Sequence, residues 1–191
     1  MHYCLLLITE RFPTDAVIKK IMRPYDEDVV YPKDEEEYDD LELPKITWDY
    51  WQVGGRYNGK FKLKFDPDDH DSEYRWMFYV NEPRAGRLFR SYLLEEMKRA
   101  KKQLFFEEDF FMSMGARDGF IYVDGGKVAD MINFETEAEK CFCFIGTDGA
   151  AHARRWWSHG KWSEDEHYDE ELKGVIANSK DCYATFIDIH N

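Results

Sequence analysis

Features that would identify a function directly are missing from this sequence. It has no Walker loop, no G-x-G-x-x-G fingerprint, no G-x-S-x-G elbow, no H-E-x-x-H and no paired C-x-x-C. No apolar run approaches the roughly 20 residues that span a bilayer. The first residues also lack the basic leader and cleavage site of a signal peptide. We therefore expect a cytoplasmic protein outside these enzyme classes, with no membrane segment.

Cysteine is also scarce. The chain has 4 cysteines, and Cys4, Cys141, Cys143 and Cys182 all fall in apolar, strand-like runs. A reduced cysteine in such a run behaves as a small buried hydrophobe. Cys141 and Cys143 point to the same side of an expected strand, but a zinc site would need two more ligands at suitable spacing. We expect no metal and no cofactor.

Acidic residues, in contrast, are abundant and clustered. The net charge is −13, and the segment Asp26–Glu42 holds ten acids and one lysine. Glu164–Glu171 holds six acids, and Asp66–Glu73 holds five. Arg84–Lys102 is the opposite, with seven bases and two acids. The molecule is therefore expected to be strongly dipolar, with acidic segments that attract cationic partners and repel free nucleic acid.

The hydrophobic pattern predicts both strands and helices. His2–Thr9 is a continuous apolar run suited to the middle of a sheet. Thr14 follows as the N-cap of a helix over Asp15–Met22. From Lys60 to Phe65 lysine alternates with apolar residues, as in a half-buried strand. Asp124-Gly125-Gly126 predicts a hairpin between Phe120–Val123 and Lys127–Ile132.

Further elements follow from the same patterns. They are a strand over Tyr74–Val80 that forms a hairpin with the strand at Lys60, a basic helix over Gly86–Phe106, an alternating strand over Lys140–Ile145, a paired strand over Ala150–Trp157, a helix over Glu164–Ala177 capped by Ser163, and a final strand over Asp181–His190. We predict a single α+β domain over residues 1–191, mainly an antiparallel sheet of about seven or eight strands with about three helices. An irregular acidic excursion covers about 25–44.

The most distinctive stretch is Trp48–Phe65, WDYWQVGGRYNGKFKLKF. A Gly-Gly turn covered by tryptophans is typical of a structural corner. The same residues would also suit a ligand site, because glycine N–H groups form an anion-binding concavity, arginine binds phosphate and aromatic rings stack on a base. That site would consist of Trp48, Trp51, Gly54, Gly55, Arg56 and Tyr57.

This motif carries a resemblance. The pattern from Trp51 through Gly54-Gly55-Arg56-Tyr57 to Gly59, together with the ending Asp188-Ile189-His190, resembles small uncharacterised proteins of bacteriophages and prophages. The resemblance covers about fifteen residues and has no assigned catalytic role. It implies a phage-type accessory factor acting in the bacterial cytoplasm against host defence, as anti-CRISPR proteins do.

Charge and resemblance together predict an interaction protein. Its acidic segments would imitate nucleic-acid phosphates and occupy the basic nucleic-acid groove of a host defence effector. The predicted partner-binding residues are Asp34, Glu35, Glu36, Glu37, Tyr38, Asp39, Asp40, Glu164, Asp165, Glu166, Asp169 and Glu170.

Two alternatives stay open. The protein could bind a nucleotide through the Trp48–Tyr57 loop, or it could hydrolyse nucleotides or RNA with His159, His167 or His190 as acid-base groups. No nucleophile is recognisable beside these histidines. An enzyme is therefore the less favoured class, and no catalytic residue is assigned.

Overall fold

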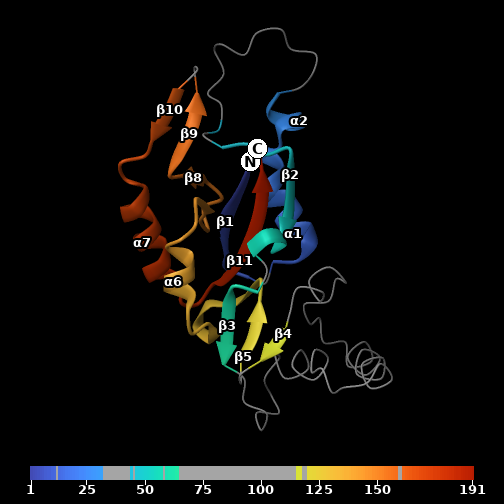
Figure 1. The fold of residues 1–191 in the computed structure, drawn as a ribbon, viewed down its shortest axis with the longest axis vertical. Helices are drawn as coiled ribbons and strands as arrows, with labels where there is room; N and C mark the ends of the chain where they lie inside the picture. The colour runs from blue at the N-terminus through green and yellow to red at the C-terminus, as the bar shows by residue number, and fades with distance from the viewer. Residues whose placement is uncertain are drawn as a thin grey trace, which may run out of the picture.

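The computed structural model describes residues 1–11, 13–31, 44, 46–57, 59–64, 115–117, 120–158 and 161–191. Within these ranges the chain is α+β, built on a six-stranded, mainly antiparallel sheet with smaller sheets of two and three strands (Figure 1). The predicted fold class is confirmed.

The strands are β1 (His2–Thr9), β2 (Tyr50–Val53), β3 (Phe61–Lys64), β4 (Gly115–Arg117), β5 (Phe120–Val123), β6 (Gly125–Lys127), β7 (Cys143–Ile145), β8 (Ala151–Ala153), β9 (Arg155–Ser158), β10 (Lys161–Glu164) and β11 (Tyr183–His190). The α-helices are α1 (Asp15–Met22), α2 (Glu27–Val30), α6 (Phe134–Ala138) and α7 (Tyr168–Asn178), and the 3-10 turns are η1 (Arg23–Tyr25), η2 (Gly55–Tyr57) and η3 (Val128–Asp130).

β1 and β11 form the centre of the main sheet. The strand order is β2-β11-β1-β7-β8, and β6 also pairs with β11. β1 and β11 are antiparallel over their full lengths, from His2 opposite His190 to Thr9 opposite Tyr183. β7 lies parallel to β1 on the other side. The two chain ends consequently lie side by side (Figure 1).

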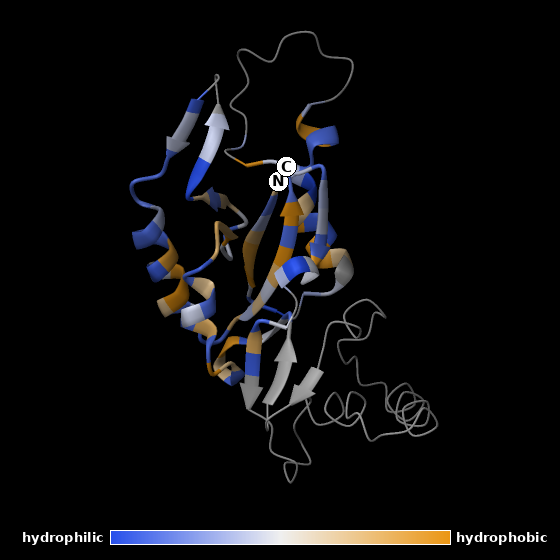
Figure 2. Ribbon diagram, in the orientation of Figure 1, coloured by the Kyte–Doolittle hydropathy of each residue, from blue (hydrophilic) through white to orange (hydrophobic). Residues whose placement is uncertain are grey.

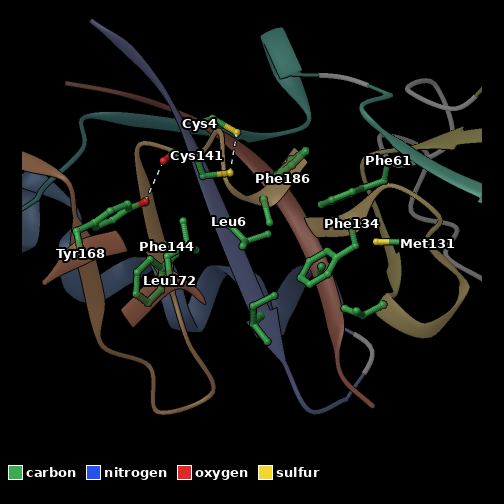
Figure 3. Packing of buried hydrophobic residues seen from close by; sticks show 14 residues of the cluster. Cys4, Leu6, Phe61, Met131, Phe134, Cys141, Phe144, Tyr168, Leu172 and Phe186 are labelled. Atoms are coloured by element: carbon green, nitrogen blue, oxygen red, sulfur yellow. Dashed lines mark hydrogen bonds between the residues drawn. The ribbon is translucent and has the colours of Figure 1, made fainter. Parts of the chain in front are cut away.

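One face of the sheet packs against α6 and α7. Leu6 and Ile8 of β1 meet Phe134 of α6 and Leu172 of α7 in this first core, shown in Figure 3. The Tyr168 hydroxyl, buried at the first residue of α7, donates a hydrogen bond to the Cys141 carbonyl at 2.9 Å, so neither polar group lacks a partner.

The opposite face packs against α1. Leu5 and Leu7 of β1 meet Ile18, Met22 and other residues in a second core. The Thr14 hydroxyl accepts a hydrogen bond from the Val17 amide at 3.4 Å, as predicted for the N-cap of α1. Since both faces of β1 are covered, a continuous apolar run is the pattern that this strand requires. Figure 2 shows apolar residues along the central strands and on the helices that cover them.

The predicted hairpin at Asp124-Gly125-Gly126 is wrong. Gly125 and Gly126 lie inside β6, which pairs with β11 and not with β5. A Cβ on Gly125 would lie 2.8 Å from the Ala184 carbonyl oxygen, so the glycine is there for close approach of two strands. The residues expected to continue this strand form η3 instead.

Other boundaries differ in detail. β8 ends at Ala153, and β9 leaves the main sheet to pair with β10. The predicted last helix begins at Tyr168, because Lys161–Glu164 is the strand β10. Cys141 belongs to the first core and Cys143 to the second, so the two side chains do not share a face as predicted.

Several predictions lie outside the described residues. These are the strand over Tyr74–Val80, the basic helix over Gly86–Phe106 and most of the acidic excursion. β3, the strand expected to pair with Tyr74–Val80, pairs with β5. None of the helices in the described part of the chain has the length and apolar character needed to cross a bilayer.

Candidate functional site

The glycine corner, residues Gly54–Gly59, links β2 to β3. Gly54 and Gly55 have φ of 69° and 52°, the left-handed region in which glycine is favoured. The Gly54 N–H donates to the Phe186 carbonyl at 2.8 Å, and the Tyr57 N–H donates to the Gly54 carbonyl at 2.8 Å. The corner is thereby held against β11.

Two buried aspartates lie beneath this corner. Asp124 accepts a hydrogen bond from the Gly59 N–H at 2.6 Å, and Asp188 accepts one from the Arg56 N–H at 3.0 Å. Their exposed fractions are 0% and 3%. The sequence predicted that the N–H groups of Gly54 and Gly55 would bind an anion. In the structure the Gly54 N–H binds the Phe186 carbonyl, and the neighbouring N–H groups of Arg56 and Gly59 bind the protein's own carboxylates.

The aromatic residues of the predicted ligand site lie on different sides of the sheet. Trp48 is fully buried in the second core, and Trp51 is half-buried against it. Tyr57 packs against the first core. Arg56 is exposed. The structure therefore does not bring these rings together around Arg56.

The predicted partner-binding acids fall in two places. Asp34, Glu35, Glu36, Glu37, Tyr38, Asp39 and Asp40 lie outside the described residues. The remaining acids lie between β10 and the first turn of α7, where Glu164, Glu166, Asp169 and Glu170 are exposed and Asp165 is half-buried. Asp169 pairs with Arg154 at 2.8 Å, so part of this charge is compensated within the chain.

An aromatic cleft that sequence reasoning missed lies between α2 and the β9-β10 hairpin. Its volume is about 220 Å³. Its aromatic lining comes from Tyr3, Tyr31, Phe142, Trp156, Trp157 and Trp162, and its polar lining includes Glu27 and Arg155. Trp157 and Trp162 are paired across the hairpin, 5.5 Å apart edge to face, yet are 59% and 47% exposed. Three tryptophans within seven residues, at 156, 157 and 162, were the available sequence signal.

The aromatic rings of this cleft already hold a cation. The Arg155 guanidinium lies 5.0 Å from the Trp162 ring centre and 5.9 Å from that of Phe142. Phe142 in turn stacks on Tyr3 at 4.2 Å. Such distances are those of cation–π contacts, so these ring faces are placed to attract positive charge.

Carboxylates border the cleft on both sides. Glu27 lines the α2 wall, and its carboxylate lies 3.5 Å from the Thr47 hydroxyl. Burial raises the pKa of Tyr31, and the negative charge of Glu27 raises it further. On the hairpin wall, Glu164 lies opposite Arg155 in the strand register. Glu27, in the acidic segment Asp26–Glu42, therefore lines the cleft, and Glu164, the first residue of Glu164–Glu171, is the strand partner of its lining residue Arg155.

The predicted acid-base histidines are separated. His159 lies outside the described residues, and His167 is the exposed residue before α7, with its N–H bonded to Asp165. His190 is paired with Asp49 at 2.7 Å and lies beside His2. Among the described residues, no three or more His, Cys, Asp and Glu side chains are grouped to hold a metal ion.

Comparisons with protein-family models, with curated proteins and with solved structures found no match for this chain.

Proposed function

We propose that this is an interaction protein that binds a basic segment of a partner protein, with the aromatic cleft receiving a cationic side chain. The observation that carries the proposal is the pair of exposed tryptophans, Trp157 and Trp162, set in a cleft that the carboxylate of Glu27 also lines. Exposed tryptophans are costly to leave in water and are enriched among the residues that dominate binding energy.

The chemistry of the cleft favours a cation. Aromatic ring faces attract guanidinium and ammonium groups. Because Arg155 lies over Trp162, the 59% exposed ring of Trp157 is the surface that would receive the partner's cation. Glu27 supplies a carboxylate on the opposite wall. The net charge of −13 adds long-range attraction for a basic partner.

The size of the cleft favours one side chain. Its volume of about 220 Å³ is below the range of about 300–1,000 Å³ that is usual for small-molecule sites. An arginine or lysine side chain presented by a protein needs less space than a nucleotide. The exposed acidic residues within Glu164–Glu170 would then contact neighbouring lysine or arginine side chains of the partner's basic segment.

The sequence resemblance gives the proposal its specific form. An acidic inhibitor that occupies the basic nucleic-acid groove of a bacterial defence effector needs such a contact with lysine and arginine side chains. A defence nuclease is therefore the first partner to test.

The direct test measures binding of a short arginine-glycine peptide by tryptophan fluorescence. Trp157→Ala and Trp162→Ala are each expected to weaken binding by about 30-fold, the size of an interface hot spot. Glu27→Gln should weaken peptide binding less than either tryptophan change. Added salt should weaken peptide binding in every variant that retains the Glu27 carboxylate. Tyr50→Ala is the matched control, because Tyr50 is 52% exposed but lies on β2, away from the cleft. Equal binding by all variants would refute the proposal.

A second test concerns the acidic segments. Capture of a nuclease effector should be reduced when Asp34, Glu35, Glu36 and Glu37 become serine, and the reduction should disappear at high salt. A thermal-shift screen with nucleotides separates the alternative. A raised melting temperature that Trp157→Ala abolishes would assign the cleft to a nucleotide instead.

A further inference from the structure

Two histidines, each paired with a carboxylate, meet at one end of the central sheet. His2 Nδ1 lies 2.9 Å from Asp188, and His190 Nδ1 lies 2.7 Å from Asp49. His2 and His190 are opposite each other in the β1-β11 register, and their ring centres are 4.9 Å apart at 61°. They are 188 positions apart in the sequence and come together only through strand pairing.

The carboxylates fix how each ring takes part in proton transfer. A carboxylate accepts hydrogen bonds, so Nδ1 of each ring carries the hydrogen and Nε2 is the nitrogen left to exchange a proton with a bound molecule. Asp188 is 3% exposed and is held from its other oxygen by the Arg56 N–H at 3.0 Å. The glycine corner therefore fixes the carboxylate that orients His2.

The surface around the pair suits a phosphodiester. Tyr50 lies opposite His190 and Gln52 opposite Asp188 in the β2-β11 register, which places both on the same face of the sheet as the histidines. Tyr50 is 52% exposed, so its ring is available to stack on a base. Arg56, whose backbone N–H binds the Asp188 carboxylate, also has an exposed side chain.

We propose that His2 and His190 are a general acid-base pair that cleaves RNA by transesterification. One neutral imidazole takes the proton from a ribose 2′-hydroxyl, and the 2′-oxygen attacks the adjacent phosphorus. The bond from phosphorus to the 5′-oxygen breaks, and the other imidazolium gives its proton to that oxygen. The products are a 2′,3′-cyclic phosphate and a 5′-hydroxyl, and no oxidant or additional reactant is needed.

RNA is favoured because it supplies its own nucleophile. Neither imidazole hydrogen-bonds to a serine, threonine or cysteine side chain in the parts of the chain that the structure describes. A reaction that needs one base and one acid, but no nucleophile from the protein, is the reaction that this pair is equipped to assist. This inference goes beyond the proposed partner binding and does not depend on it.

The charged and titratable groups around the pair come from several elements. They are Asp188 on β11, Asp49 before β2, Arg56 and Tyr57 in η2, and the amino group of Met1, which contacts the Asn191 carbonyl. The hydrogen bond from His190 holds the pKa of Asp49 below its usual value. The cationic groups in this set are the exposed side chain of Arg56 and the amino group of Met1, which could bind an approaching phosphate.

The test incubates the full chain with a fluorogenic single-stranded RNA in the presence of EDTA across pH 4–9. The expected result is cleavage with 2′,3′-cyclic phosphate ends, a bell-shaped pH profile, and no cleavage of the same sequence made with 2′-O-methyl ribose. His2→Gln and His190→Gln should each lower the rate by about 10²–10⁴-fold. Asp49→Asn, a positioning change, should lower the rate less and shift one limb of the pH profile.

His152→Gln is the matched control. His152 is likewise paired with a carboxylate, Glu171, at 2.7 Å, but lies on β8 away from the pair. The His152→Gln variant should cleave at the wild-type rate. The contrast between this rate and the lower rates of the His2→Gln and His190→Gln variants excludes a contaminating nuclease as the source of activity. Absence of cleavage by the wild-type protein, or equal rates in the His2, His190 and His152 variants, would overturn the proposal, and melting curves show whether a variant has folded.

Discussion

Gly54→Ala gives the sharpest test of the glycine corner. A Cβ at Gly54 would lie 2.3 Å from Asp124 Oδ2 and 2.4 Å from its Cγ, whereas ordinary van der Waals contact begins at 3.4 Å. Asp124 has no exposed surface and is held by the Gly59 N–H at 2.6 Å, so its carboxylate cannot swing aside. The φ of 69° adds a second penalty for any residue with a side chain.

The two penalties can be estimated separately. Placing an L-residue in the left-handed region costs about 1–2 kcal/mol, and overpacking a filled interior costs about 1–3 kcal/mol. Gly54→Ala should therefore reduce the free energy of unfolding by about 2–5 kcal/mol. This is a large fraction of the total of about 5–15 kcal/mol that is usual for a domain.

Two other glycines isolate the components. Gly149 has φ of 79° with nothing within 4 Å of a built Cβ, so Gly149→Ala pays only the backbone penalty. Gly174 lies in α7, also with nothing within 4 Å, and Gly174→Ala should stabilise the protein by about 1 kcal/mol. Urea unfolding followed by circular dichroism measures all three changes.

A double-mutant cycle identifies the cause. Asp124→Ala removes the atoms that a Cβ at Gly54 would meet, so Gly54→Ala made in that background should cost only about 1–2 kcal/mol. The reasoning fails if Gly54→Ala costs no more than Gly149→Ala, or if its cost is unchanged in the Asp124→Ala background.

Two further predictions follow from buried groups. Burial raises the pKa of Tyr168 well above its usual value, so the hydroxyl stays protonated in the folded state at a pH where it ionises in the unfolded state. The contribution of this group to the free energy of unfolding is therefore fully present below about pH 10 and is lost as the pH rises further. Tyr168→Phe, which leaves the Cys141 carbonyl without this donor, should cost about 1–3 kcal/mol at pH 7 and show a shallower decline above pH 10, and an unchanged decline in urea titrations would contradict this account. Among the cysteines, burial raises the pKa of Cys143, and hydrogen bonding to Cys4 together with burial raises that of Cys141. Of the four free thiols only the half-buried Cys182 should react promptly with an aromatic disulfide reagent in the native protein, and prompt reaction of two or more would refute the assigned burial.

Local sequence patterns correctly predicted the elements that depend on burial along one strand or on hydrogen bonds between neighbouring residues. The unbroken apolar run of β1 follows from burial on both faces, and Thr14 caps α1 through its own neighbouring amide. The hairpin predicted at Asp124-Gly125-Gly126 was wrong because glycine is required both where two strands approach closely and in tight turns. Here the close approach of β6 to β11 is the reason for Gly125. Nothing in a single sequence separates these two causes.

The candidate sites could not be predicted because they are assembled across the fold. The cleft joins Glu27 on α2 to Arg155 on β9, and the histidine pair joins the first strand to the last. Residues so distant in sequence are related only by sheet topology. The seven-residue stretch from Trp156 to Trp162 did contain a local signal for the cleft. The sequence did not reveal that β9 and β10 pair so that Trp157 and Trp162 lie opposite each other.

The two proposed activities are expected to be separable, because consecutive residues of β1 point to opposite faces of the sheet. Tyr3 lines the cleft, whereas His2 belongs to the histidine pair. Trp157→Ala should therefore weaken peptide binding by about 30-fold at an unchanged rate of RNA cleavage, and His190→Gln should lower the cleavage rate without changing peptide binding. Measuring both variants in both assays provides the check. Loss of both activities in either variant, with an unchanged melting temperature, would mean that the two faces form one site and that neither assignment stands as made.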